Sequence, residues 1–447
     1  MRSVMRAAWI VIFAVVVIAG VLRFYPSSTV EGGETGSTSS ASPVAGDEEP
    51  GPRFLARDDP REPSAADTGA PPLRKEPREG GSRSRRGFGW AGKDGAEPDQ
   101  LALAAALLSG TPEEVGRALD ARTDLSAERR GFYSAFAHAM GGSRDEALRI
   151  LGGIDESSLT TRERSLLREV LTGQSSGARP ASAAAAPSTP SHGAPLAAME
   201  MRLLWRESRS LLDAGEFARA ARGFSELLID GLEAPWQTAR AALADWSEGL
   251  RVAQERYRFD PRAEWPSVEI EVVDGDSLTH IRKRYLASRP DTRMCTGLIA
   301  RANRITGFIH PGETLRVPTA RVHVLIDLSS RWVLYLHDDE VVAAWEAGIG
   351  REGEETITDE FVTGLKQEEP MWFPRGREPV PYPNNPLGTR WIGWHRDGEK
   401  SGYGIHGTWE PETIGEPASE GCIRLLNEHV EELFEILPLG APILVRE

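Results

Sequence analysis

Residues 27–98 set the first limit on what this chain can fold into. They are rich in Gly, Ser, Pro, Glu and Arg, and their few apolar side chains are scattered. Such a stretch buries too little apolar surface to offset the conformational entropy that ordering removes. We therefore predict a disordered linker over residues 27–98 and expect folded domains only after it. A chain of 447 residues is long enough for two or three such domains.

An apolar run precedes this linker. Residues 7–22 carry no charge and are flanked by Arg2 and Arg6 before them and Arg23 after them. The run is short for a membrane span and long for the apolar part of a signal peptide. Residues 1–26 are predicted to be a signal anchor, with a cleaved signal peptide as the alternative. Both would export the rest of the chain, because the positive flank stays inside, so a membrane contact is expected at this end.

The charge of the chain limits its partners. A formal net charge of −15 argues against nucleic-acid binding, because nucleic-acid-binding domains are usually basic. The basic run at residues 83–86 is typical of solvated linker, with contact to an anionic surface as the alternative. The nine His are dispersed without a His-Glu-x-x-His motif, and no Gly-rich loop ends in Lys-Ser or Lys-Thr. We predict neither a metal nor a cofactor.

Two segments have helical periodicity, residues 99–173 and residues 197–262, with a Pro/Ala/Ser-rich linker over residues 174–196. Apolar residues recur three or four positions apart in both, and Thr111 before Pro112 is typical of a helix start. In its spacing of Leu, Gly, Phe and Ala, the second segment resembles a tetratricopeptide helix hairpin, without a clean repeat of about 34 residues. An ordinary helical bundle is the alternative. The resemblance implies a protein partner for this region.

Residues 267–319 follow a different pattern. Alternation at residues 268–272 predicts a strand, two helices follow, and residues 309–318 supply a turn and a short strand. This β-α-α-β order resembles a LysM module, which implies binding to glycans that contain N-acetylglucosamine, such as peptidoglycan. A spacer that has lost ligand binding is the alternative. By this resemblance the glycan-binding loops contain Gly275, Asp276, Ser277, Ile305 and Ile309.

Strand patterns dominate residues 320–447. Apolar residues alternate between residues 322 and 343, which predicts a β-meander. The chain is therefore predicted to be a multidomain α+β protein, with an N-terminal anchor, a linker, a helical region, a small β-α-α-β module and a mainly β C-terminal domain.

Aromatic residues are frequent in residues 365–400, among many turn residues. Long loops with aromatic side chains over a β scaffold are common substrate walls. Packing within the loop's own small core is the alternative. Trp372 and Trp394 fit either role, whereas Trp391 fits a structural role better.

Cys422 and His406 are the candidates for chemistry. Cys422 follows Gly421, and His406 lies in the sequence Gly-Ile-His-Gly-Thr. The thiolate is the reactive form of Cys, and a nearby imidazole is the usual means of generating it near neutral pH. The glycines allow close backbone approach and expose amides to a developing oxyanion. The alternatives are a buried structural Cys and a structural His, or a disulfide with Cys295, which would remove the nucleophile.

Three ordered motifs resemble the catalytic domain of the L,D-transpeptidase (YkuD) family over about residues 320–447. They are residues 382–391 (YPNNPLGTRW), 404–408 (GIHGT) and 414–425 (IGEPASEGCIRL). The resemblance implies a nucleophilic Cys422 and a general base, His406, that is oriented by the carbonyl group of Gly407. It also implies an oxyanion and substrate site whose candidate residues are Gly421, Glu420, Ser419, Arg424, Tyr403, Trp394 and Trp372. The amides of Gly421 and Cys422 are the expected oxyanion donors.

One position departs from the family pattern. Glu420 stands where the family usually has a His before Gly-Cys. A buried carboxylate this close to the thiol would disfavour the thiolate. Either Glu420 faces solvent or binds a cationic substrate amine, or the activity is attenuated.

The resemblance implies a peptidoglycan L,D-transpeptidase in the cell envelope, with its catalytic domain in the periplasm or cell wall. It would release the terminal D-Ala of a tetrapeptide stem, form a thioester on Cys422 and pass the acyl group to an amine, giving a 3→3 cross-link. Water as the acceptor would make the enzyme an L,D-carboxypeptidase. A non-catalytic peptidoglycan-binding scaffold and a cysteine amidase or endopeptidase are the alternatives.

Overall fold

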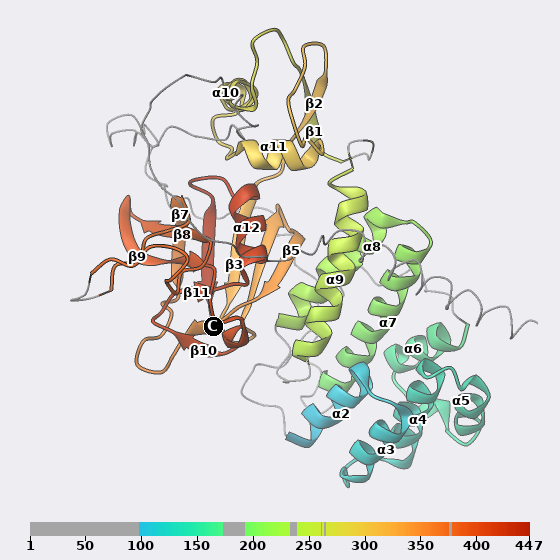
Figure 1. Cartoon of the computed structure of the whole chain (residues 1–447). Coiled ribbons are helices and arrows are strands. Elements are labelled where there is room, and N and C mark those ends of the chain that lie inside the picture. The colour runs from blue at the N-terminus through green and yellow to red at the C-terminus, as the bar shows by residue number, and fades with distance from the viewer. Residues whose placement is uncertain (1–97, 173–192, 233–238, 261, 263–264, 375–377) are drawn as a thin grey trace, which may run out of the picture. The chain divides into compact units, whose positions relative to one another are not determined.

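The computed structural model describes residues 98–172, 193–232, 239–260, 262, 265–374 and 378–447 (Figure 1). The predicted anchor at residues 1–26, the predicted linker up to residue 97 and most of the linker at residues 174–196 lie outside these residues. Within the described residues, no helix combines the length and the hydropathy that a membrane crossing requires.

Helices form the first part of the described chain. Their bounds are α2 Pro98–Ser109, α3 Pro112–Asp120, α4 Ala127–Met140, α5 Arg144–Leu151, the 3₁₀ turn η1 Glu156–Ser158, α6 Thr161–Thr172, α7 Gly193–Asp213, α8 Phe217–Leu232 and α9 Ala239–Tyr257. At the start of α3, the Thr111 hydroxyl accepts from the Glu114 amide while the Glu114 carboxylate accepts from the Thr111 amide. This capping box satisfies two amides that a helix start leaves unpaired.

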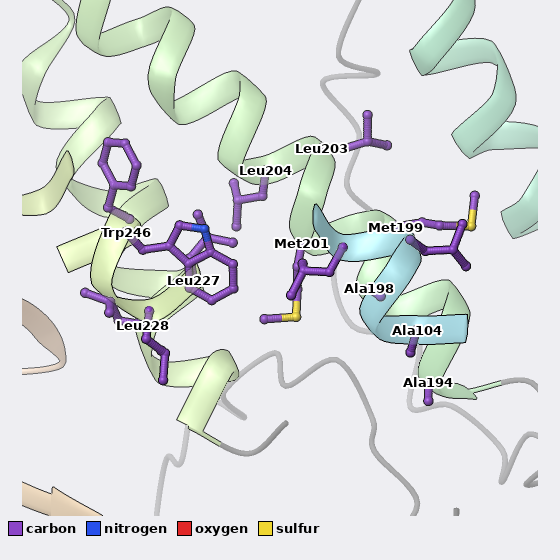
Figure 2. Close-up of a cluster of buried hydrophobic side chains, with 14 of the residues drawn as sticks. Ala104, Ala194, Ala198, Met199, Met201, Leu203, Leu204, Leu227, Leu228 and Trp246 are labelled. Carbon is purple, nitrogen blue, oxygen red and sulfur yellow. The ribbon is translucent and has the colours of Figure 1, made fainter. Parts of the chain in front are cut away.

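The helices pack through a continuous apolar core. Met201 and Leu204 of α7, Leu227 and Leu228 of α8, and Trp246 of α9 are all buried. Figure 2 shows these side chains gathered in one cluster. Burying a large apolar side chain stabilises a fold by about 1.5–3 kcal/mol, so this cluster accounts for the helical hairpin. The prediction of a helical region before a β-rich domain is confirmed.

A small β-α-α-β segment follows α9. Its elements are β1 Ser267–Glu271, α10 Leu278–Ser288, α11 Thr296–Ala302 and β2 Thr314–Pro318. β1 and β2 are antiparallel, with Ile270 opposite Leu315. Tyr285 and Leu298 are buried beneath them, from α10 and α11. The element order is the predicted one, and glycan binding by this segment remains a prediction.

The C-terminal part is rich in strands. Its elements are β3 Val322–Asp327, β4 Trp332–His337, β5 Glu340–Glu346, β6 Ile349–Gly350, β7 Asp359–Glu368, β8 Arg390–Arg396, β9 Glu399–His406, the 3₁₀ turn η2 Pro411–Thr413, β10 Pro417–Ser419, β11 Ile423–Arg424, α12 Asn427–Ile436 and β12 Pro442–Arg446. Eight strands form a sheet in the order β11-β9-β8-β7-β12-β3-β4-β5. β11 runs parallel to β9 and β12 parallel to β3, while the other neighbours are antiparallel.

Helix α12 packs against β8 and β9. Val430 and Leu433 of α12 are fully buried together with Ile392 of β8 and Ile405 of β9. The helix therefore begins, at Asn427, close to the end of β9.

Helices α8 and α9 cover the edge strand β5. The described residues all belong to one compact unit, residues 81–447, and these contacts lie within it. The Ser225 hydroxyl of α8 accepts from the Val341 amide at 2.8 Å, and the Ser247 hydroxyl of α9 donates to the Ala344 carbonyl at 2.7 Å. The Gln254 amide of α9 donates to the Val341 carbonyl at 3.1 Å. These side chains satisfy backbone groups that an edge strand would otherwise leave unpaired.

Candidate active site

The parallel pairing of β11 with β9 puts the two predicted catalytic residues on neighbouring segments of the sheet. Ile423 lies opposite Ile405 and Arg424 lies opposite His406. Cys422 therefore lies opposite Gly404, whose backbone amide acts to lower the pKa of the thiol. The Leu425 amide donates to the His406 carbonyl at 2.9 Å and extends the pairing past the strand ends.

The turn that carries Cys422 is held by one hydroxyl group. The Ser419 Oγ donates to the Cys422 carbonyl at 2.6 Å and accepts from the Gly421 amide at 3.2 Å. Gly421 has a φ of +100°, in the region that favours glycine. A Cβ at this position would lie 2.8 Å from Cε1 of Tyr403, so the Tyr403 ring lies against the nucleophile turn.

His406 is 4% exposed, and its ring is oriented by its own chain. Its Nδ1 lies 2.6 Å from the carbonyl oxygen of Gly407, the partner that the sequence predicted. Because a carbonyl only accepts, Nδ1 carries the proton and Nε2 keeps its lone pair. Burial lowers the pKa of His406 to about 4, the Gly407 hydrogen bond opposes this, and the charge of Arg424 adds to the lowering.

The thiol of Cys422 is half-buried. Burial raises its pKa to about 11, the Gly404 amide and the Arg424 charge lower it, and the Glu420 charge raises it. With the pKa of His406 lowered as well, the thiol of Cys422 and the imidazole of His406 are both neutral near pH 7.

Trp391, for which the sequence favoured a structural role, contacts His406. It lies opposite His406 in the antiparallel pairing of β8 with β9, and the two rings stack with centroids 5.9 Å apart and planes 19° apart. Gly404 lies beneath the indole, because a Cβ there would come within 2.8 Å of it. The sequence signal for this contact is the strand register, which requires the long-range pairing to be known.

Arg424 is mostly buried beside the catalytic pair, with 12% of its side chain exposed. Its Nη1 donates to Glu410 and to the Thr413 hydroxyl, both at 3.3 Å. Its Nε has no hydrogen-bond partner among the residues that the structure describes. Its charge acts on both His406 and Cys422, and a guanidinium with a spare donor is a group that can bind a carboxylate.

Glu420 faces solvent, with 69% of its side chain exposed, and its carboxylate lies 3.6 Å from the guanidinium of Arg351. Its effect on the pKa of Cys422 is the smallest of those acting on that group. This placement favours the solvent-facing alternative over strong attenuation.

The two tryptophans predicted for a substrate wall are placed differently. Trp394 is 1% exposed and stacks with Phe361, with ring centroids 5.1 Å apart, so it belongs to the core of the sheet. Trp372 is half-buried in the loop after β7, where its backbone pairs with that of Val380. The structure does not bring Trp372 into a recorded contact with Cys422 or His406 within the described residues.

The candidate glycan-binding residues lie in two loops of the β-α-α-β segment, one between β1 and α10 and one between α11 and β2. Asp276 accepts from the Val273 amide and pairs with Arg284 at 2.8 Å, and Ser277 caps α10. Gly275 has a φ of +79°. Ile305 and Ile309 are half-buried against the core. Phe308 between them is 84% exposed, a feature that the sequence prediction did not include.

The described residues contain no group of three or more His, Cys, Asp or Glu that could hold a metal ion.

Comparison with known proteins places the likeness in the C-terminal domain. Residues 321–445 match the YkuD family, described as the L,D-transpeptidase catalytic domain. The "Putative L,D-transpeptidase YqjB" of Bacillus subtilis (strain 168) is 32% identical over 126 residues, which are 28% of this chain and 71% of that protein. The "Putative L,D-transpeptidase YkuD" of the same strain is 26% identical over 182 residues, and the match covers 39% of this chain and 96% of that protein. The NMR structure of the catalytic domain from E. faecium L,D-transpeptidase aligns at 24% identity and a TM-score of 0.23, over 29% of this chain and 98% of that one.

Proposed function

This chain belongs to the L,D-transpeptidase family through its C-terminal domain, and we propose that it is a cysteine acyltransferase that acts on the stem peptides of peptidoglycan. The observation that supports this most directly is the register of β11 against β9. It sets Cys422 opposite Gly404, two residues along β9 from a His406 whose Nδ1–H is bonded to Gly407 and whose Nε2 is left to accept a proton.

In the first half-reaction, the sulfur of Cys422 attacks the carbonyl between the third stem residue and the terminal D-Ala, while His406 Nε2 takes the thiol proton. The C–N bond breaks, His406 gives the proton to the leaving D-Ala amine, and a thioester remains on Cys422. Because the Gly421 amide already donates to Ser419, the Cys422 amide is the better oxyanion donor of the predicted pair.

In the second half-reaction, a side-chain amine of another stem attacks the thioester. His406 accepts a proton from that amine and returns one to the departing sulfur, which leaves a 3→3 cross-link and the free thiol. Arg424 holds a substrate carboxylate through its spare donors, and Tyr403 and Trp391 form walls of the site. Water in place of the amine gives a tripeptide and an L,D-carboxypeptidase.

The remaining assignments extend this proposal to the whole chain. The β-α-α-β segment acts as a LysM module that binds peptidoglycan glycan strands, with the exposed Phe308 beside the predicted loops. Residues 1–26 anchor or export the chain, so that the catalytic domain works in the cell envelope. The helical region is the site of a protein partner.

The test uses the full chain with defined tetrapeptide muropeptides and, separately, with a carbapenem. We expect release of D-Ala, a cross-linked dimer, and a covalent adduct on the peptide that contains Cys422, read by mass spectrometry. Cys422→Ala abolishes all three, whereas Cys295→Ala, which removes the other cysteine, keeps them. Tripeptide without dimer identifies the carboxypeptidase. Absence of both product and adduct in the wild type refutes the proposed function and favours the scaffold.

A further inference from the structure

Asn427, the first residue of α12, connects three segments around His406. Its Oδ1 accepts from the Thr408 amide at 3.1 Å and from the Thr389 amide at 3.3 Å. Its Nδ2 donates to the Thr408 carbonyl at 3.0 Å. One side-chain amide therefore holds both backbone groups of Thr408 and also the residue that precedes β8.

The Thr408 amide belongs to the same peptide group as the Gly407 carbonyl. A trans peptide is planar, and its C=O and N–H point in opposite directions. The carbonyl end of this peptide accepts from His406 Nδ1 at 2.6 Å, and the amide end donates to Asn427. Fixing the N–H end consequently fixes where the carbonyl points, and hydrogen bonds in such a chain polarise one another.

Two glycines permit this approach. A Cβ at Gly407 or at Gly388 would overlap Oδ1 of Asn427. Gly388 has a φ of +63°, which also favours glycine. The Asn427 amide is thus enclosed by backbone on two sides and has little freedom to rotate away from Thr408.

We infer that Asn427 is a positioning residue for the general base. It acts through the Gly407–Thr408 peptide, holding the Gly407 carbonyl where it accepts the Nδ1 proton of His406 and so keeping the Nε2 lone pair available to the thiol of Cys422. This inference rests on the proposed function for its kinetic consequences, but its structural claim about the His406 tautomer stands apart from any activity. Arg424 is the charged group that acts on the imidazole within the described residues, and Asn427 carries no charge of its own.

The test compares Asn427→Ala, Asn427→Asp and a matched control, Asn303→Ala. Asn303 also makes three hydrogen bonds with its amide, to Ile299 and Arg316, but in the β-α-α-β segment. We expect Asn427→Ala to slow acylation of Cys422 by a carbapenem about tenfold to a hundredfold, the cost of a misplaced catalytic group. Asn427→Asp keeps a side-chain oxygen that accepts from the Thr408 amide, so this variant should recover most of the wild-type acylation rate. Its added negative charge favours the protonated form of His406, so the fall in acylation rate at low pH should begin at a higher pH than in the wild type. Asn303→Ala leaves the rate and the profile unchanged.

The second readout is NMR of the imidazole nitrogens of His406, which needs no turnover. In the wild type and in Asn303→Ala, Nδ1 carries the proton, whereas Asn427→Ala populates the Nε2–H tautomer. If Asn427→Ala keeps the wild-type tautomer and Asn427→Asp keeps the wild-type titration of His406, the inference is overturned. A wild-type protein that forms neither muropeptide product nor carbapenem adduct refutes the proposed function alone, because the tautomer measurement still decides the role of Asn427.

Discussion

Arg424 lies directly opposite His406 in the pairing of β11 with β9, and its charge lowers the pKa of both His406 and Cys422. The two effects serve the same chemistry, since one keeps the imidazole unprotonated and the other favours the thiolate. Burial, by contrast, disfavours both charged forms and is the larger influence on each group. The imidazole of His406 and the thiol of Cys422 are therefore both neutral near pH 7.

The first prediction concerns the pH dependence of acylation. His406 must be unprotonated to act as a base, and its pKa is lowered from 6.5 to about 4. The rate of Cys422 acylation by a carbapenem should therefore hold as the pH falls through 6.5 and decline only near pH 4. Arg424→Gln removes a cation that opposes imidazolium, so its acid limb moves to higher pH. Arg321→Gln, which removes an exposed cation at the start of β3, serves as the control and leaves the limb in place. An acid limb near 6.5 in the wild type would contradict the placement of His406.

The second prediction concerns stability and a different histidine. Burial holds the pKa of His337 well below 6.5, and the charges of Arg258 and His323 act in the same direction. Below pH 6.5 His337 binds a proton in the unfolded chain but stays unprotonated in the folded state. The free energy of unfolding is therefore fully retained above this pH and decreases as the pH falls. The slope is about 1.4 kcal/mol per pH unit for one group.

His337→Leu should flatten this slope, because it removes the buried imidazole while the Tyr335 hydroxyl keeps its bond to the Ile436 carbonyl at 3.0 Å. Denaturation midpoints measured across this pH range are the readout. His310→Leu, which removes an exposed histidine, should leave the slope as it is in the wild type. Equal slopes for both variants would show that His337 is not buried in solution.

The third prediction separates backbone strain from collision at the nucleophile turn. Gly421 has a φ of +100° and the Tyr403 ring beside it, whereas Gly398 has a φ of +85° with open space around it. Gly398→Ala should cost about 1–2 kcal/mol of stability and leave acylation unchanged. Gly421→Ala should in addition displace Cys422 and slow acylation about a hundredfold. If the two variants are acylated equally fast, the contact of Tyr403 with the turn has no role in holding the nucleophile.

The sequence singled out Cys422 and His406 as candidates because their signals are local. Cys422 and His406 each lie in a short glycine-flanked motif, and the carbonyl that orients His406 belongs to the next residue. The helical region and the strand-rich C-terminal domain were likewise predictable, since periodicity is a local property.

What the sequence missed depends on pairing between distant segments. The stacking of Trp391 on His406 follows from the register of β8 against β9, and the burial of Trp394 follows from its position on the same strand. A shift of one residue in that register would exchange the faces of the two side chains, and aromatic content alone does not fix it. The role of Asn427 could not be predicted from the sequence either, because the segments that it joins are distant in the chain and meet only in the folded structure.

The last prediction tests the cover that α8 gives to the edge of the sheet. Ser225→Ala removes the acceptor of the Val341 amide, and both groups are buried. An unsatisfied buried amide costs about 1–3 kcal/mol, so the denaturation midpoint should fall. Ser247→Ala is the matched control on α9, where the bond to the Ala344 carbonyl is only partly buried, and the loss should be smaller. Acylation of Cys422 should be unchanged in both variants, because β5 and β11 are at opposite ends of the strand order. A midpoint for Ser225→Ala equal to that of the wild type would mean that α8 does not pair with β5 in solution, and the helical region would then be free to bind elsewhere.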